Sequence, residues 1–128
     1  IGCTASFTQV AGLSAVRGPQ QPVDAMVAEY RRRRDVLVAG LNAIPGVTCR
    51  MPQGAFYAFP NITAFGRSAE WLADYLLEKA GVAVLPGTAF GSGGEGYIRV
   101  CFANSMEKIS QAVVRMDEAL RKLMRRQD

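Results

Sequence analysis

The stretch "YIRVCFA", residues 97–103, is apolar except for an arginine at its centre. Its alternation predicts a strand that presents Arg99 on one face and Ile98 and Val100 on the other. An arginine stays charged at any working pH, so burying it without an anionic partner is costly. The apolar face can pack against helices while Arg99 faces a cleft. The first question is therefore which anion that cleft holds.

The segments on either side of this strand predict a small α+β domain. The first half of the chain predicts a helix within residues 1–17, a break at 18–22, a long helix over 23–41, and a hairpin of strands 47–51 and 55–59 with its turn at 52–54. The second half predicts a helix over 68–80, an apolar strand over 82–85, the strand around Arg99, and a last helix that begins near Ser105. The buried side of the helix over 68–80 is expected to carry Trp71, Leu72, Tyr75 and Leu76. We expect a three- to four-stranded sheet that helices cover on one face, preceded by a long connecting helix.

The composition is that of an ordinary globular protein and excludes several classes of site. The chain has 128 residues, of which 49% are hydrophobic. No apolar run is long enough to span a bilayer, so no membrane association is expected, and a cytoplasmic location is the default. Cys3, Cys49 and Cys101 form no CxxC pair and the chain has no histidine, which argues against a metal site and favours reduced thiols.

Two motifs suggest a polyanion and are better explained otherwise. The net charge is +4, and the run "RRRR" at 31–34 lies on a predicted helix, where consecutive residues point in different directions and form no single basic face. The loop "GSGGEG" at 91–96 matches G-x-G-x-x-G, but it leads into a strand rather than a helix, and Glu95 would repel phosphate. We expect a solvated helix surface, no nucleic-acid partner, and a flexible connection between strands.

Few residues remain for catalysis. Without histidine, Ser-His and Cys-His pairs are impossible, and Lys79, Lys108 and Lys122 all fall on predicted helices or at their ends. Arg99 has two open interpretations. It either snorkels or pairs with a carboxylate of the same chain, or it grips a substrate carboxylate through two parallel hydrogen bonds.

Longer stretches carry a family resemblance. "RRRRDVLVAGLNAIPGVTCRMPQGAFYAFPN" and "AGVAVLPGTAFGSGGEGYIRVCFANS", with the closing helix, resemble the C-terminal part of pyridoxal-phosphate-dependent aminotransferases of fold type I, class I/II. The likeness covers nearly all of the chain and is greatest to the bacterial and archaeal aspartate aminotransferases. It implies that residues 1–22 end a large domain and lead into a linker, and that 23–128 form the small C-terminal domain with its connecting helix.

The resemblance also implies roles for individual residues. Arg99 matches the arginine that binds the α-carboxylate of amino-acid and 2-oxo-acid substrates, and Phe56 matches an aromatic near the substrate in some members, although core packing also explains it. The Schiff-base lysine and the other ligands of pyridoxal 5'-phosphate lie upstream in the family and have no counterpart here. We therefore expect a fragment of a homodimeric enzyme that lacks its N-terminal large domain, binds no cofactor by itself and is inactive alone.

Two function classes follow from these observations. The first is an enzyme that transfers an amino group between an amino acid, with aspartate suggested by the subgroup likeness, and a 2-oxo acid such as 2-oxoglutarate. The second is a free-standing carboxylate-binding or interaction module without catalysis, suggested by the missing lysine and by a chain that begins at Ile1 rather than at Met.

Overall fold

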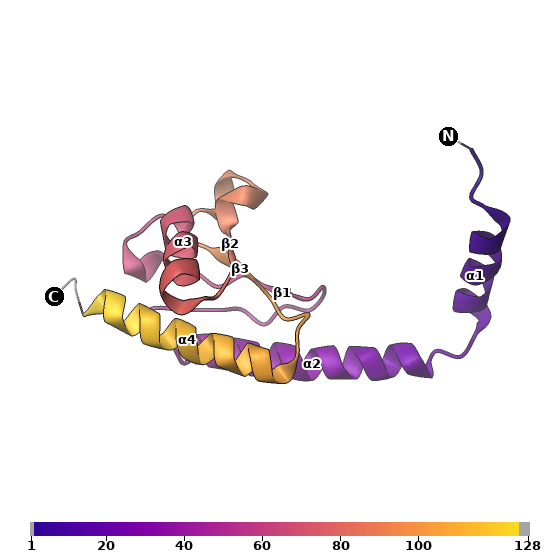
Figure 1. Ribbon diagram of the computed structural model, residues 1–128, viewed down its shortest axis with the longest axis horizontal. Coiled ribbons are helices and arrows are strands. Elements are labelled where there is room, and N and C mark those ends of the chain that lie inside the picture. The colour runs from indigo at the N-terminus through magenta and orange to yellow at the C-terminus, as the bar shows by residue number, and fades with distance from the viewer. Residues whose placement is uncertain (1, 126–128) are drawn as a thin grey trace.

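Helices account for most of the regular structure in the computed structural model, which describes residues 2–125 (Figure 1). The elements are α1 (Ser6–Arg17), α2 (Gln21–Asn42), β1 (Tyr57–Ala58), the 3-10 helix η1 (Thr63–Phe65), α3 (Ala69–Ala80), β2 (Leu85–Pro86), the 3-10 helices η2 (Gly87–Phe90) and η3 (Ser92–Gly94), β3 (Ile98–Cys101) and α4 (Met106–Met124). The predicted α+β class and the long helix that precedes the sheet are confirmed.

The sheet has three antiparallel strands in the order β1-β3-β2, so the strand that carries Arg99 is central. Tyr57 pairs with Cys101 on one side, and Leu85 pairs with Arg99 on the other. Alternate residues of β3 enter the core that α2, α3 and α4 cover, as predicted. The core includes Leu37, Val38, Leu41, Leu72, Leu76, Ile98, Val100, Phe102, Ile109, Met116 and Leu120, all buried.

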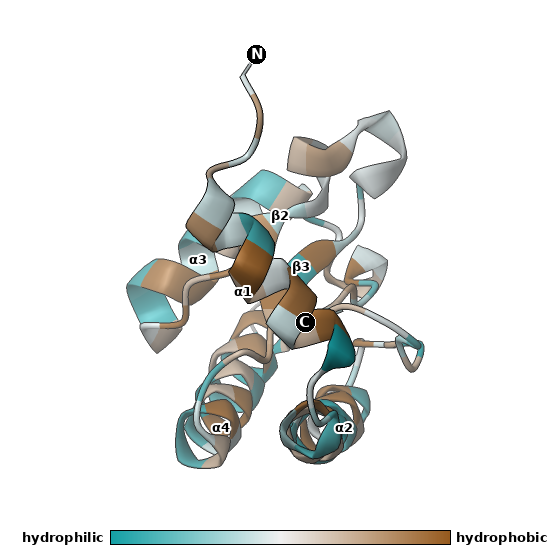
Figure 2. Ribbon diagram, turned by 90° about the vertical axis from the view of Figure 1, so that its right-hand side faces the viewer, coloured by the Kyte–Doolittle hydropathy of each residue, from teal (hydrophilic) through white to brown (hydrophobic). Residues whose placement is uncertain are grey.

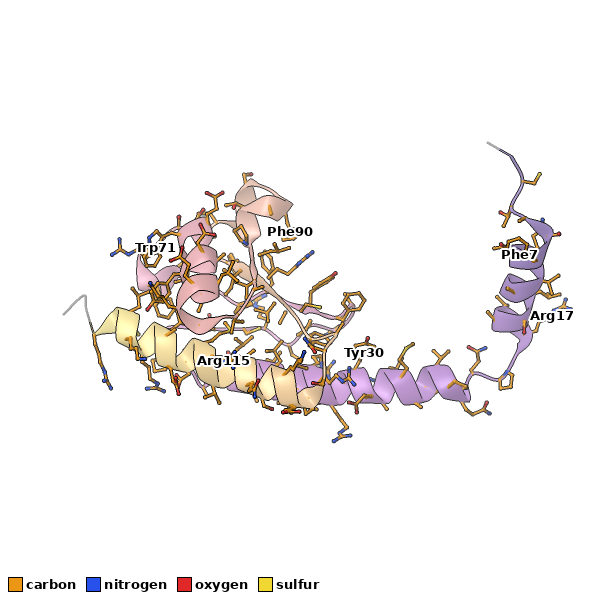
Figure 3. The ribbon with its side chains drawn as sticks, in the orientation of Figure 1. Phe7, Arg17, Tyr30, Trp71, Phe90 and Arg115 are labelled. Atoms are coloured by element: carbon orange, nitrogen blue, oxygen red, sulfur yellow. The ribbon has the colours of Figure 1, made fainter. Side chains whose placement is uncertain are left out.

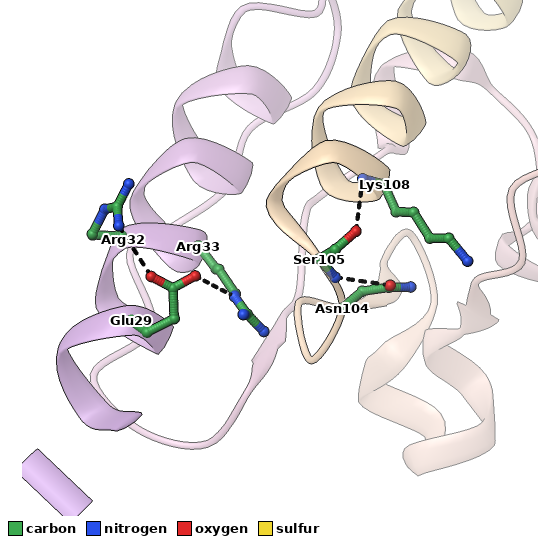
Figure 4. Close-up of polar contacts among 6 residues, drawn as sticks. All are labelled: Glu29, Arg32, Arg33, Asn104, Ser105 and Lys108. Carbon is green, nitrogen blue, oxygen red and sulfur yellow. Dashed lines mark hydrogen bonds and ion pairs between the residues drawn. The ribbon is translucent and has the colours of Figure 1, made fainter. Parts of the chain in front are cut away.

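Local capping sets the ends of the helices that build this core. The Ser68 hydroxyl accepts a hydrogen bond from the Trp71 N–H at 3.2 Å. This contact caps the start of α3. Gly81 ends α3 in the left-handed conformation, with φ of 63°. Ser105 caps α4 in the same way by accepting from the Lys108 N–H at 3.3 Å (Figure 4). The predicted start of the last helix and the predicted Gly81 cap are both confirmed.

The predicted hairpin of residues 47–51 and 55–59 is wrong. Residue Thr48 forms only an isolated bridge with Asn61, and β1 pairs with β3 instead. The reason lies in Asn42, whose side chain bonds both the N–H and the carbonyl of Cys49, so these groups are not free for a strand neighbour. Ala55 also has φ of 56°. This left-handed conformation breaks an extended strand.

The predicted strand at 82–85 is reduced to Leu85 and Pro86. Val82 completes the end of α3 by donating its N–H to the Leu76 carbonyl, at 3.2 Å, rather than joining a ladder. The predicted burial of Trp71 is also wrong. Its ring lies on the outside of α3, stacked on Tyr75 and covered by the Arg67 guanidinium, whose carbon is 5.0 Å from the ring centroid (Figure 3).

The first helix lies apart from the rest of the fold. α1 has no buried residue, and Figure 2 shows hydrophobic residues along it. Its apolar side chains, from Phe7 to Val16, are more than half exposed. Within residues 2–125, no helix combines the length and hydrophobicity needed to cross a membrane.

Candidate functional site

Arg99 lies on the face of the sheet that the helices do not cover. Its guanidinium carbon is 4.1 Å from the centroid of the Tyr57 ring and 4.1 Å from that of Phe90. Tyr57 belongs to β1, and Phe90 belongs to the η2 turn that follows β2, so the two rings come from segments on opposite sides of β3 in the chain's sheet order. Cations are attracted to aromatic faces, and two such contacts fix the side chain far more firmly than one.

The guanidinium has no anionic partner within the described part of the chain. No carboxylate of residues 2–125 forms an ion pair with Arg99, whereas Arg32, Arg33, Arg34 and Arg121 all have one. The in-chain carboxylate that we considered for Arg99 is therefore not present among these residues. A planar guanidinium fork held by aromatic rings, with its N–H groups unpaired, can bind a carboxylate through two parallel hydrogen bonds.

More aromatic rings extend this face. Phe59 stacks on Tyr97 at 5.4 Å between centroids and meets Phe90 edge to face at 6.3 Å. A groove of about 600 Å³ lies beside them, lined by Tyr57, Phe59 and Tyr97 and, on its other side, by the segment from Thr48 to Pro52. The site thus consists of one cation on an aromatic floor next to an open groove.

Phe56, the other predicted site residue, is placed differently. Its ring stacks on Tyr30 of α2, at 6.2 Å between centroids, and touches the Tyr57 ring at 4.7 Å. The rings that contact Arg99 are Tyr57 and Phe90, which the sequence reasoning missed. The period of two in "FYAF" could have identified Tyr57, since a strand that pairs with β3 brings alternate residues to the Arg99 face.

The thiol beside this site is buried. Cys49 lines the groove, and burial raises the pKa of its thiol above the ordinary value, so it stays protonated at neutral pH. Within residues 2–125, no group of three or more His, Cys, Asp or Glu side chains could hold a metal ion.

The basic run of α2 is divided among separate partners. Glu29 binds both Arg32, at 3.2 Å, and Arg33, at 2.8 Å (Figure 4). Arg34 pairs with Asp35 and donates to the Pro52 carbonyl at 3.2 Å. This confirms that the run does not form a single basic face.

Comparison with known proteins identifies the family of the chain. The sequence profile of the aminotransferase class I and II family matches residues 1–116. The chain belongs to that family. It is 48% identical over 122 residues to an aspartate aminotransferase of Pyrococcus horikoshii, a match that covers 94% of this chain and 31% of the relative.

Solved aminotransferases have the same fold. The aromatic aminotransferase of Pyrococcus horikoshii is 39% identical, with a TM-score of 0.89 over 94% of this chain and 33% of that structure. A PLP-bound putative aminotransferase of Clostridium difficile is 26% identical, with a TM-score of 0.83 over 94% of this chain and 31% of its own. This aminotransferase chain therefore spans about one third of the length of these relatives.

The side chains of this aminotransferase chain do not by themselves fit pyridoxal phosphate. The family uses a lysine to hold the cofactor as a Schiff base, but the three lysines here lie exposed on helices: Lys79 on α3, and Lys108 and Lys122 on α4. None belongs to the sheet face of Arg99.

Proposed function

We propose that this chain is the C-terminal part of a PLP-dependent aminotransferase that moves an amino group between an amino acid, first of all aspartate, and a 2-oxo acid such as 2-oxoglutarate. The family membership and the relatives named aspartate aminotransferase support the proposal. The observation that carries it is Arg99, whose guanidinium contacts two aromatic rings and pairs with no carboxylate of residues 2–125.

In this proposal Arg99 binds the α-carboxylate that amino acids and 2-oxo acids share. Two parallel hydrogen bonds fix the plane of the carboxylate, and the rings of Tyr57 and Phe90 fix the plane of the guanidinium. The Cα–H bond of the substrate is thereby oriented before any bond breaks, which is a positioning contribution to the rate.

The cofactor chemistry requires residues that this chain does not supply. Pyridoxal phosphate, when bound, accepts the electrons that are released at the substrate Cα. The lysine and the phosphate ligands belong, in this proposal, to a large domain that precedes residues 23–128 and ends within 1–22. The complete enzyme is proposed to be a homodimer, and residues 1–128 alone are proposed to be inactive.

Phe56 is retained as a second substrate-site residue on the family likeness. Phe56 contacts the Tyr57 ring, and Tyr57 contacts the Arg99 guanidinium, so Phe56 is linked to the carboxylate site through one side chain. Its stacking on Tyr30 supports the alternative role in packing.

The test compares two arginines that each lie on aromatic rings. In the complete enzyme, Arg99→Leu should lower kcat/KM for aspartate by at least about 100-fold, because a charge-assisted bidentate contact is lost. Arg99→Lys should recover only part of the loss, because an ammonium is not a planar fork. Arg67→Leu, which removes the cation on Trp71, is the matched control and should change kcat/KM by less than about twofold. Full activity in Arg99→Leu would refute the proposed carboxylate role.

A further inference from the structure

The glycine-rich loop "GSGGEG" at 91–96 does not fit a nucleotide site, but its contacts suggest that it helps to position Arg99. We infer that Glu95 is a positioning residue for Arg99. Its carboxylate fastens the segment 87–96 to the start of α3, and that segment holds the Phe90 ring against the Arg99 guanidinium. The inference rests on the proposed function of Arg99 and adds a residue to it.

The Glu95 carboxylate lies at the N-terminus of α3. Its Oε1 accepts hydrogen bonds from the N–H of Ala69, at 2.9 Å, and from the N–H of Gly96, at 3.1 Å. Ala69 is the first residue of α3, so its N–H has no partner within the helix, and a negative charge is favourable at this end of the helix dipole. Glu95 and Ser68 therefore satisfy different N–H groups of the same helix start. Of these two contacts, the Glu95 contact is the one that joins the helix start to the loop.

The segment that Glu95 fastens is closely packed. The backbones of Gly87 and Gly94 meet so closely that a Cβ on either one would overlap the carbonyl oxygen of the other. The Gly87 N–H donates to the Tyr97 carbonyl at 2.8 Å, and the Thr88 hydroxyl donates to Glu70 Oε1 of α3 at 3.2 Å. The predicted flexible connection is thus a defined pair of 3-10 turns attached to α3 at both of its ends.

Phe90 depends on this attachment. It is the last residue of η2, half of its side chain is exposed, and its ring centroid lies 4.1 Å from the Arg99 guanidinium carbon (Figure 3). Besides Arg99, the ring meets Phe59 edge to face at 6.3 Å, and its position also depends on the backbone turn that carries it. Loss of the Glu95 contact leaves the segment attached to α3 only through Thr88, which loosens the turn and shifts the ring from the guanidinium, so that Tyr57 becomes the main aromatic contact of Arg99.

The experiment measures the affinity of the complete enzyme for maleate, a dicarboxylate that cannot donate or accept an amino group, by calorimetric titration. Glu95→Ala should raise the dissociation constant about fivefold, the size expected when one cation–π contact is lost. Ser68→Ala is the matched control, because it removes a cap from the same helix start and leaves the loop attached. It should lower the melting temperature similarly but keep maleate affinity within about twofold.

A double-variant comparison identifies the route through Phe90. Phe90→Leu should raise the dissociation constant for maleate by a factor similar to that of Glu95→Ala. The double variant should bind maleate as tightly as the weaker-binding single variant, because both changes remove the same contact. The inference would be overturned if the increase in the dissociation constant of the double variant equalled the product of the two single increases. It would also be overturned if Glu95→Ala kept a maleate affinity within about twofold of the parent.

Two further variants keep the result interpretable. Glu95→Asp retains the charge but shortens the reach to Ala69, and it serves in place of Glu95→Ala if that variant does not fold: a raised dissociation constant supports the inference, and an unchanged one overturns it. Arg99→Leu belongs in the same titration. An unchanged affinity in Arg99→Leu would refute the proposed function itself, whereas an effect there without one at Glu95 would refute only the positioning role.

Discussion

The side chain of Asn42 bonds both backbone groups of Cys49. Its Nδ2 donates to the Cys49 carbonyl at 2.9 Å, and its Oδ1 accepts from the Cys49 N–H at 2.7 Å. One amide at the end of α2 thus takes the place of a neighbouring strand. It fixes the start of the segment that lines the groove beside Tyr57.

Asn42→Ala should therefore lower the free energy of unfolding by about 2 kcal/mol, because two partly buried backbone groups lose their partners. Urea denaturation of the 128-residue chain measures this. Asn104→Ala is the control, since the Asn104 amide is exposed and accepts only from the adjacent Ser105 N–H. This control should stay within about 0.5 kcal/mol of the parent, as most surface substitutions do. Equal losses in the two variants would contradict the strand-like role of Asn42.

The Tyr57 ring is expected to support Arg99 through its face and not through its hydroxyl. Tyr57→Leu should weaken maleate binding to the complete enzyme by about two- to thirtyfold, the range that one lost cation–π contact allows. Tyr57→Phe keeps the ring and should bind maleate like the parent. Weakened binding in Tyr57→Phe would point to the hydroxyl as the contributing group instead.

Phe56→Leu separates the two roles considered for that ring. If Phe56 borders the substrate, as we propose, the variant should raise KM for aspartate by about three- to tenfold, the loss expected when one aromatic contact is removed. Tyr30→Leu, which removes the stacking partner in α2, should lower the melting temperature and leave KM close to the parent. An unchanged KM in Phe56→Leu together with reduced stability would assign the ring to packing.

The burial of Cys49 predicts a pH dependence. Because its pKa is raised in the folded state, the unfolded chain loses this proton first as the pH rises. The contribution to stability is therefore complete below the ordinary thiol pKa and is lost as the pH rises through the folded value. Unfolding curves between pH 8 and pH 10 should show a fall that is absent from Cys49→Ala.

The same burial predicts different rates of thiol modification. Cys3 and Cys101 are exposed and should react readily with a thiol reagent at pH 8, whereas Cys49 should react only after denaturant is added. Mass spectrometry of the separate peptides distinguishes the three. Rapid modification of Cys49 in the folded chain would contradict its burial.

The contact between Gly87 and Gly94 predicts a strong difference between nearby glycines. Gly87→Ala should destabilise the chain by about 2 kcal/mol or more, because the added Cβ overlaps a backbone carbonyl that cannot move freely. Gly93→Ala, in the same loop, adds a Cβ in open space and should be close to neutral. Thermal unfolding of the two variants tests this, and similar melting temperatures would contradict the packing.

Patterns along single elements predicted much of this structure, and contacts between elements decided what was missed. The alternation in β3 correctly gave the two faces of the sheet, with Ile98 and Val100 buried and Arg99 on the opposite face, because this depends only on local periodicity. The hairpin prediction was wrong because the Asn42 side chain, several residues upstream, forms hydrogen bonds with the N–H and the carbonyl of Cys49. Trp71 has i,i+4 spacing with Tyr75 rather than with the buried Leu72 and Leu76, so its ring stacks on Tyr75 at the edge of the buried side and stays exposed.

The same division applies to the candidate site. A charged residue in an apolar strand is visible in the sequence, so Arg99 could be singled out. Phe90 could not, since it reaches Arg99 through a loop whose path depends on Glu95 and the start of α3. Such a contact between segments far apart in the chain has no periodic signal.

The exposure of helix α1, which has no buried residue, affects how the protein can be handled. Phe7, Val10, Leu13 and Val16 are all open to solvent, so they form an apolar surface on a helix that has no buried residue. We expect the chain to adsorb to plastic and to hydrophobic resins and to aggregate as it is concentrated. Val10→Glu together with Leu13→Glu, both outside the core, should reduce this aggregation and give a single sharp peak in size-exclusion chromatography.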